Sequence, residues 1–285
     1  MKILLTNDDG IKAPGLWAAV EGLRKVGEVF VVAPDREQSG VGASLTLHSS
    51  LTVKNETVPD SINGSPASDS TTSDSLAGSQ NGFHSVTAYS VQGTPGDSCI
   101  LALENVVGAV DLVVSGINSG SNVGWDVMVS GTFGAALQGH LRGYPTIAIS
   151  VGAVNNPQFS AASKLLEMIA LRFRDNAPAS SLFLNVNIPS QPADRIAGLK
   201  VTQLGGRSYG ESVRVEGTGD EKKYWISRNR PISGMPVDGT DIWALKNNYI
   251  SITPMQISFG QQQQAADVEK LVDGISEKLL KPSGD

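Results

Sequence analysis

The first 33 residues constrain the fold of this chain more than any other segment. Lys2–Thr6 (KILLT) is predicted to be a short buried strand, Pro14–Val26 an amphipathic helix, and Glu28–Ala33 (EVFVVA) a second strand. A strand, a helix and a second strand within this length make a βαβ unit, which requires a parallel sheet with a right-handed crossover. The N-terminal part of the chain is therefore expected to belong to an α/β domain.

The same alternation continues along the chain. Further helices are predicted over 94–107, 131–142 and 160–173, and further strands over 111–115, 145–151 and 182–188. Several such units in succession predict a doubly wound, mostly parallel sheet in a Rossmann-like, three-layer α/β fold. We assign residues 1–198 to this α/β core.

Three segments depart from this pattern. Residues 55–82 are rich in Ser, Asn, Asp, Thr and Gly, which predicts a flexible surface insertion at the tip of a hairpin. Residues 199–254 alternate with a period of two, which predicts β-hairpins projecting from the core, with turns at 205–206 and 217–219. Residues 255–285 form a tail with a predicted helix over 265–280, packed either on its own domain or on a neighbouring subunit.

Composition excludes several classes of protein. The net charge of -6 argues against a nucleic-acid-coating protein, which carries a basic surplus. The single cysteine, Cys99, excludes an internal disulfide and a CxxC-type zinc site. The chain has neither an apolar run of about 18 residues nor a signal-like N-terminus, so we expect no membrane partner and a cytoplasmic location.

The loops that follow the predicted strands carry the chemistry. Ligands of parallel α/β sheets bind at the carboxyl ends of the strands. There the chain places Asn7-Asp8-Asp9-Gly10, then residues 34–42 (PDREQSGVG), then residues 116–124 (GINSGSNVG) and, shortly after, residues 130–132 (SGT). These loops supply carboxylates, amides and hydroxyls without histidine or cysteine, which is the oxygen-rich set that Mg²⁺ or Mn²⁺ prefers.

The paired acids Asp8 and Asp9 strengthen this interpretation. Adjacent carboxylates repel each other unless a cation lies between them or one is protonated. Residues 130–132 open a predicted helix, whose amides and dipole favour an anion, and Ser39 with Gly40 can present amides to the same anion. Each loop alone fits an ordinary turn or helix cap, but together they favour a metal–phosphate site.

The ordered motifs resemble a known family. MKILLTNDDGIKAPGL, VFVVAPDREQSGVGASLT, GTPGDS and DLVVSGINSGSNVGWDVMVSGTFGAALQG are similar to the stationary-phase survival protein SurE family, and the similarity continues at 144–150 and 237–254. The resemblance implies a metal-dependent phosphatase of nucleoside monophosphates, a 5'/3'-nucleotidase. Some members also act on short polyphosphate.

Carried over motif by motif, the resemblance implies a set of functional residues. It implies one Mg²⁺ or Mn²⁺ per subunit, held by Asp8, Asp9, Ser39 and Asn118, with the two aspartates also catalytic. Phosphate contacts are expected from Ser130, Gly131 and Thr132, with Ser39, Gly40, Ser115, Gly116 and Asn118 beside them. It also implies a homodimer or homotetramer with exchanged C-terminal segments. Two departures are Gly96, where the family commonly has alanine, and the long insertion at 55–82.

Two other functions compete with this one. A haloacid-dehalogenase-type phosphatase also has an aspartate after its first strand, but requires Asp-x-Asp, and here Gly10 stands where the second acid would fall. A non-catalytic metal or nucleotide sensor would bind a ligand without releasing phosphate. Within the phosphatase hypothesis, Asp8 is expected to act either as the nucleophile or as the base that activates a water.

Overall fold

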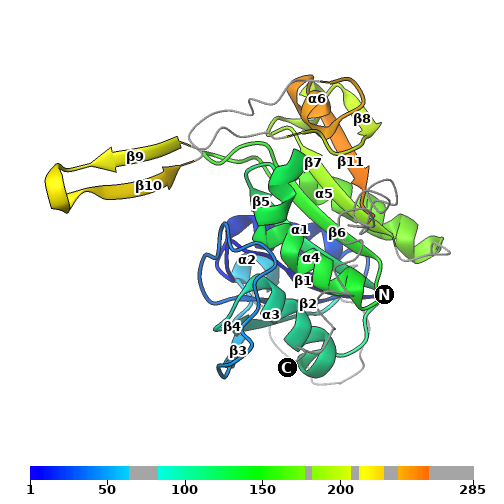
Figure 1. The fold of residues 1–285 in the computed structure, drawn as a ribbon. Coiled ribbons are helices and arrows are strands. Elements are labelled where there is room, and N and C mark those ends of the chain that lie inside the picture. The colour runs from blue at the N-terminus through cyan, green and yellow to red at the C-terminus, as the bar shows by residue number, and fades with distance from the viewer. Residues whose placement is uncertain (64–82, 177–181, 207–211, 228–236, 257–285) are drawn as a thin grey trace, which may run out of the picture. The chain divides into compact units, whose positions relative to one another are not determined.

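The computed structural model describes residues 1–63, 83–176, 182–206, 212–227 and 237–256 (Figure 1). The chain divides into two compact units, Met1–Met255 and Gln256–Asp285. Everything described below belongs to the first unit. The helix predicted over 265–280 lies outside the described residues.

The first unit is built on a nine-stranded sheet with the strand order β3-β4-β2-β1-β5-β6-β7-β11-β8. Its strands are β1 (Lys2–Thr6), β2 (Glu28–Pro34), β3 (Val53–Glu56), β4 (Val86–Val91), β5 (Leu112–Ser119), β6 (Thr146–Val151), β7 (Phe183–Ile188), β8 (Gly198–Val201) and β11 (Tyr249–Pro254). The run from β4 to β7 is parallel throughout, whereas β3 and β11 are antiparallel to their inner neighbours. The prediction of a mostly parallel sheet is confirmed.

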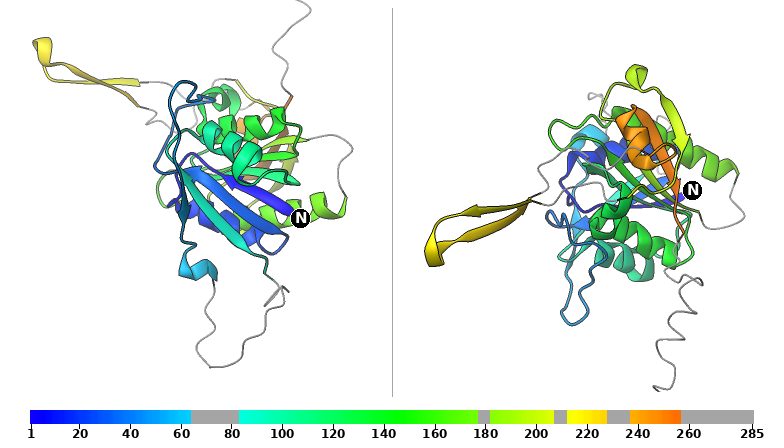
Figure 2. Two further views of the ribbon diagram at one scale, coloured as in Figure 1. Left: turned by 90° about the horizontal axis from the view of Figure 1, so that it is seen from below. Right: turned by 45° about the horizontal axis from the view of Figure 1, so that its top comes forward.

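Helices cover both faces of this sheet (Figures 1 and 2). They are α1 (Pro14–Leu23), α2 (Asp60–Asn63), α3 (Pro95–Leu101), α4 (Gly131–Leu141), α5 (Ser160–Asp175) and α6 (Asp241–Lys246), with a π-helical turn at Ala102–Val106 and short 3₁₀ turns at Gly124–Val129, Ala193–Arg195 and Gly219–Glu221. Leu16 of α1 and Leu166 of α5 pack in one buried cluster, and Cys99 of α3 and Ala135 of α4 in another. Two helix layers around one sheet confirm the doubly wound, three-layer fold.

Alternation along each strand explains why both faces are filled. In β1, Ile3 and Leu5 belong to the cluster under α1 and α5, while Leu4 belongs to the cluster under α3 and α4. Every residue of β6 is buried, as expected of a strand in the middle of a parallel sheet with helices on both sides. The apolar runs of the sequence therefore decide the central strands directly.

The predicted hairpin extension at 199–254 is only partly right. β8 and β11 pair with each other, and β11 also pairs antiparallel with β7, so both strands extend the main sheet. Only β9 (Ser212–Glu216) and β10 (Lys223–Ser227) form a separate antiparallel hairpin. A period of two marks a strand with unlike faces but says nothing about its partner. For this reason the sequence does not reveal that the core sheet continues beyond residue 198.

The predicted insertion at 55–82 also needs correction. Its first residues complete β3 and form α2, and the side chains of Val58 and Ile62 are buried in the core. The Arg24 guanidinium donates a hydrogen bond to the Ile62 carbonyl oxygen and holds this segment against α1. Residues 55–63 therefore pack on the domain through these two apolar side chains, the hydrogen bond from Arg24 and the pairing of β3 with β4. Residues 64–82 lie outside the described part of the chain.

The helices in the described ranges are too short or too polar to cross a membrane.

Candidate active site

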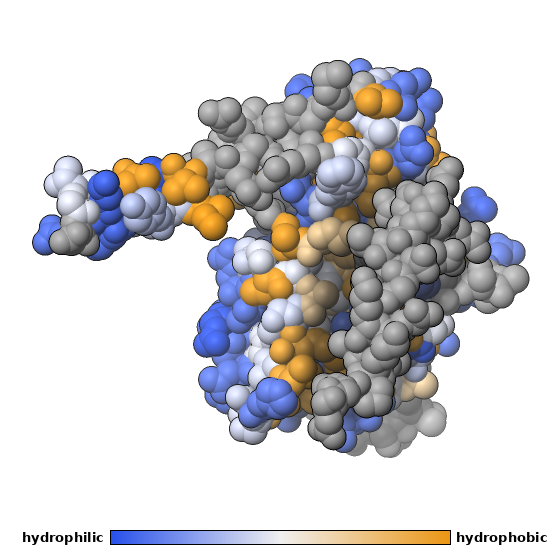
Figure 3. Space-filling model, in the orientation of Figure 1, coloured by the Kyte–Doolittle hydropathy of each residue, from blue (hydrophilic) through white to orange (hydrophobic). Residues whose placement is uncertain are grey.

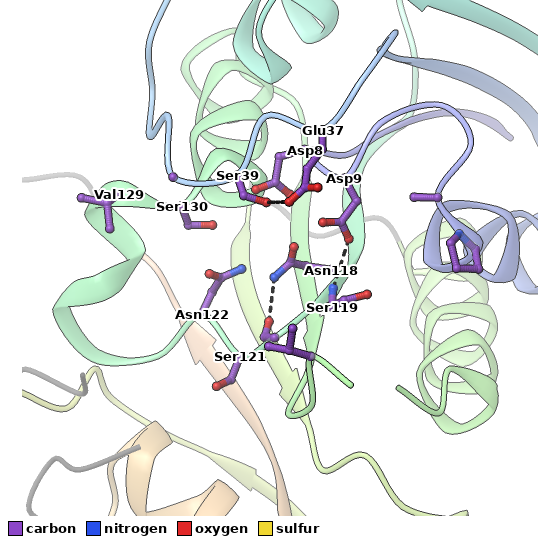
Figure 4. Close-up of a pocket in the computed structure, with 15 residues that line it drawn as sticks. Asp8, Asp9, Glu37, Ser39, Asn118, Ser119, Ser121, Asn122, Val129 and Ser130 are labelled. Atoms are coloured by element: carbon purple, nitrogen blue, oxygen red, sulfur yellow. Dashed lines mark hydrogen bonds between the residues drawn. The ribbon is translucent and has the colours of Figure 1, made fainter. Parts of the chain in front are cut away.

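A cleft of about 560 Å³ opens at the carboxyl ends of β1, β2 and β5 (Figure 4). Six of the predicted site residues line it: Asp8, Asp9, Ser39, Gly40, Asn118 and Ser130. They come from the turn after β1, the loop after β2, the end of β5 and the N-cap of α4, which the parallel strand order brings to one edge of the sheet. The prediction that these segments converge therefore agrees with the structure.

The turn after β1 presents the two aspartates. The Asn7 carboxamide donates to the Gly10 carbonyl oxygen at 3.0 Å and accepts from the Gly10 amide at 3.2 Å, so it closes the turn with two hydrogen bonds. Between these residues Asp8 is buried and Asp9 half-buried. Asp9 Oδ2 accepts from the Ser119 amide at 3.2 Å, which ties the turn to the end of β5.

Asp8 takes its hydrogen bonds from the start of α4. The Thr132 hydroxyl donates to Asp8 Oδ1, and the Thr132 amide also hydrogen-bonds the carboxylate. Gly131 makes this approach possible, because a Cβ there would lie 2.7 Å from Asp8 Cβ. Only glycine fits at position 131 without moving Asp8.

Crowding and burial shift the acidity of both carboxyls. The pKa of Asp8 is raised to about 6, because burial and the charge of Asp9 raise it by more than the hydrogen bonds from Thr132 lower it. Burial also raises the pKa of Asp9, as does the charge of Glu37, while the Ser119 amide lowers it. A bound cation would relieve both the desolvation and the repulsion.

The loop after β2 brings Ser39 to the cleft. The Gln38 amide donates to the Asp8 carbonyl oxygen at 2.7 Å, so this loop is bonded directly to the turn after β1. The Ser39 hydroxyl donates to Glu37 Oε1 at 2.9 Å. Further along, the Gly42 amide donates to the Val129 carbonyl oxygen at 3.1 Å, which holds the loop near the N-terminus of α4.

The glycine-rich run that begins within β5 and continues beyond it brings two asparagines. The pairing of β5 with β6 shifts register between Ser115 and Asn118, and Asn118 then points into the cleft. Its Nδ2 donates to the Gly120 carbonyl oxygen at 2.6 Å, which leaves the carboxamide oxygen toward the aspartates (Figure 4). Asn122 also lines the cleft, and its side-chain Nδ2 donates to the Ser150 hydroxyl at 2.9 Å.

Four predicted site residues do not line the cleft: Ser115, Gly116, Gly131 and Thr132. Gly131 and Thr132 contact Asp8 from behind, as described above. Ser115 is fully buried beside Thr6, and neither hydroxyl has a hydrogen-bond partner among the described residues. At Gly116, a Cβ would lie 2.3 Å from the Ile149 carbonyl oxygen, so glycine allows β5 to pack against β6.

Several lining residues have no counterpart in the sequence prediction. They are Ala13, Pro14, Glu37, Ser119, Gly120, Ser121, Asn122, Val129 and Val154. Proximity in sequence was an available signal for some of them, since Glu37 stands two residues before Ser39, and residues 119–122 continue the glycine-rich run. Val154, on the loop after β6, had no such signal because only packing brings it over Gly120.

The polar donors fit a hard divalent cation. Asp8 and Asp9 contribute carboxylates, Ser39 a hydroxyl and Asn118 a carboxamide oxygen, all of which suit Mg²⁺ or Mn²⁺. Within the described residues, no group of three His, Cys, Asp or Glu side chains is arranged to hold a metal. A cation here would therefore depend on two carboxylates together with neutral oxygens, and would keep room for water or phosphate.

The fold and the cleft together define a class: a doubly wound α/β protein with an oxygen-rich, acidic small-molecule site at the carboxyl edge of its sheet. Residues 3–211 match the family described as Survival protein SurE. The chain belongs to this family, as its motifs predicted.

Individual relatives support the assignment. The 5'-nucleotidase SurE of Dehalococcoides mccartyi (strain CBDB1) is 42% identical over 265 residues, covering 92% of this chain and 91% of that protein. The 5'-nucleotidase SurE of Nitrosomonas europaea is 37% identical over 274 residues, covering 94% and 98%. The crystal structure of the SurE protein from Aquifex aeolicus superposes with a TM-score of 0.75 at 33% identity, covering 96% of this chain and 100% of that one.

Proposed function

We propose that this protein is a divalent-metal-dependent phosphomonoesterase that hydrolyses nucleoside monophosphates to nucleoside and phosphate, with short-chain polyphosphate as a further substrate. The observation that carries the proposal is the convergence of Asp8, Asp9, Ser39 and Asn118 in one cleft. Relatives named 5'-nucleotidase SurE match more than nine-tenths of the chain, which supports the choice of substrate.

Asp8, Asp9, Ser39 and Asn118 would hold one Mg²⁺ or Mn²⁺ per subunit. When bound, the ion would polarise the phosphoryl oxygens and offset the charge that develops on them. Within the protein, the opening of α4 favours the phosphate, because the N-terminus of a helix carries a partial positive charge. Ser130 caps this helix, accepting from the Phe133 amide at 3.1 Å, and lines the cleft.

Asp8 is the reactive carboxylate in this proposal. As the nucleophile it attacks phosphorus and forms an acyl phosphate, which water then hydrolyses; as the base it deprotonates an attacking water. In both cases the bond between phosphorus and the nucleoside oxygen breaks, and the nucleoside oxygen takes up a proton as it leaves. Both roles need the ionised carboxylate. Thr132 supports them because its hydrogen bonds orient the carboxylate and lower its pKa.

The cleft is large enough for a nucleotide. Its volume of about 560 Å³ lies within the range typical of small-molecule sites. The acidic and amide groups gather around Asp8, whereas Ala13, Pro14, Val129 and Val154 add apolar lining. This division suits a ligand with a charged phosphate and a flatter, less polar nucleoside.

The test measures phosphate release from AMP by the purified protein. We expect EDTA to abolish turnover, Mn²⁺ to restore it, and Asp8→Asn to lower it by at least about 10³-fold. Asp194→Asn, an exposed aspartate outside the cleft, serves as the matched control and should keep full activity. Turnover that ignores the chelator or survives Asp8→Asn contradicts the proposal, and AMP binding without phosphate release points to the sensor.

We also propose that the protein assembles as a homodimer or homotetramer. The β9–β10 hairpin supports this, because Val213, Val215, Tyr224 and Ile226 form one exposed, largely apolar face on paired positions (Figure 3). Ile226 alone is 80% exposed. Sedimentation should give an oligomer for the wild type and a smaller species for the double variant Val213→Lys/Ile226→Lys. A wild type that sediments as a monomer at micromolar concentration argues against assembly.

A further inference from the structure

One acidic side chain of the cleft has no role in the proposed metal set. Glu37 lines the cleft with Asp8 and Asp9, and its Oε1 accepts a hydrogen bond from the Ser39 hydroxyl at 2.9 Å (Figure 4). Glu37 is exposed to solvent, so its side chain does not stabilise the protein by packing in the core. Core packing therefore does not account for Glu37, and we consider a role in the cleft, through its hydrogen bond with Ser39.

The hydrogen bond decides how the serine presents its oxygen. A serine hydroxyl carries one hydrogen and two lone pairs. Because that hydrogen is directed to Glu37, the lone pairs of Ser39 Oγ are left free for a cation. Without an acceptor at Glu37, the hydroxyl rotates and its hydrogen can point at the cation instead. Partners of this kind, one bond behind a metal ligand, change metal affinity by about 10–100-fold when removed.

The loop geometry keeps Glu37 and Ser39 on the same side. Between them, the Gln38 amide donates to the Asp8 carbonyl oxygen at 2.7 Å, which fixes the centre of the turn against the loop after β1. Both flanking side chains then face the cleft. The two loops that carry the acids and the serine are therefore joined at the backbone.

Glu37 also carries a negative charge at the proposed metal site. It lines the same cleft as Asp8 and Asp9, so its negative charge stands near the two carboxylates of the proposed metal set. Asp8, Asp9 and Glu37 are nevertheless not arranged as a three-acid metal group in the described chain. This favours an indirect role for Glu37 over direct ligation.

Resting on the metal dependence proposed above, we infer that Glu37 is a positioning residue. It holds the Ser39 hydroxyl with its lone pairs toward the divalent cation and thereby sets how tightly the site binds that cation. Glu37 does not contact the phosphate in this scheme.

The test measures Mn²⁺ binding to the full chain directly, from the electron paramagnetic resonance signal of free Mn²⁺. We expect Glu37→Ala to weaken binding by about 10–100-fold. Glu37→Gln keeps an acceptor oxygen and should lose less. In a Ser39→Ala background, Glu37→Ala should have a much smaller effect, because no hydroxyl remains to be oriented. Glu21→Ala, at an exposed position of α1, is the control and should bind as the wild type does.

Each other outcome overturns the inference in a recognisable way. If the wild type binds Mn²⁺ and hydrolyses AMP while Glu37→Ala binds within twofold of it, only the role of Glu37 is wrong. If Glu37→Ala has the same effect with and without Ser39, or if Glu37→Gln is as weak as Glu37→Ala, Glu37 acts through charge and does not position the hydroxyl. If the wild type binds no Mn²⁺, the metal-dependent function fails as well. Thermal unfolding without metal checks that each variant is folded.

Discussion

Asp8, in the turn after β1, and Asp241, the first residue of α6, are both buried aspartates, yet their hydrogen-bond partners differ. Asp8 is 4% exposed and takes its hydrogen bonds from Thr132, with Asp9 beside it and the cleft in front. Asp241 is fully buried and accepts three backbone amides, from Gly124 at 2.8 Å, Gly205 at 2.7 Å and Ile242 at 2.8 Å. Burial raises the pKa of both carboxyls.

The difference shows that burial and a raised pKa do not by themselves mark a reactive carboxylate. Asp241 joins the start of α6, the segment after β8 and the 3₁₀ turn that follows Asn122, and both of its oxygens are occupied. Its role is to hold chain segments together. Asp8 faces a cleft and another carboxylate, so the lone pairs that do not accept hydrogen bonds from Thr132 are available to a ligand. We therefore expect substitution by asparagine to lower the free energy of unfolding at Asp241 and to raise it at Asp8.

The largest effect is expected from Asp241→Asn. The new carboxamide has one oxygen and one NH₂ group, so an NH₂ donor would face the Gly124 or Gly205 amide and leave it unpaired. The loss of charge-assisted bonds and the unpaired buried amide should lower the free energy of unfolding by about 4 kcal/mol. Urea unfolding of the metal-free protein measures this. A variant as stable as the wild type would mean that Asp241 is not the structural anchor described here.

Asp8→Asn should stabilise the metal-free protein, and only above acidic pH. Because the pKa of Asp8 is raised to about 6 in the folded protein, its favourable contribution is complete below the ordinary value of 3.8 and is lost as the pH rises through 6. The asparagine variant avoids that loss, so its advantage should grow from near zero at pH 4 to about 3 kcal/mol at pH 8.

Urea unfolding in EDTA at both pH values tests this expectation. A stability difference that is the same at pH 4 and pH 8 would show that the Asp8 carboxyl does not titrate with a raised pKa. Asp194→Asn, the exposed control, should show no pH-dependent difference from the wild type.

A smaller effect is expected from Thr132→Val, which sharpens the comparison at Asp8. Valine removes the hydroxyl that lowers the pKa of Asp8, so that pKa should rise further. Metal binding in the proposed function needs the ionised carboxylate, so the pH midpoint of Mn²⁺ binding should move up by about one unit, which corresponds to roughly 1.4 kcal/mol. Thr132→Ser keeps the hydroxyl and is the matched control. A midpoint that moves down, or equal shifts for both variants, would refute the role given to the hydroxyl.

Local pattern determined much of this protein before its structure was known. The apolar runs at 2–6, 28–33 and 145–151 predicted strands that the structure places at Lys2–Thr6, Glu28–Pro34 and Thr146–Val151. The rule that parallel strands present their ligands at one edge then brought Asp8, Asp9, Ser39, Asn118 and Ser130 together correctly. Both inferences depend on residues close in sequence and on a general property of parallel sheets.

Only the tertiary structure decided which partners the remaining segments find. β11 pairs with β7 and β8, and Val58 and Ile62 enter the core, because of contacts with residues far away in sequence. The same holds within the site, where Thr132 lies behind Asp8 and Glu37 lies in front beside Ser39. A periodic pattern records which face of a segment is buried, whereas the partner of a strand or side chain depends on packing between distant segments. That physical difference separates what the sequence determined from what it left to the fold.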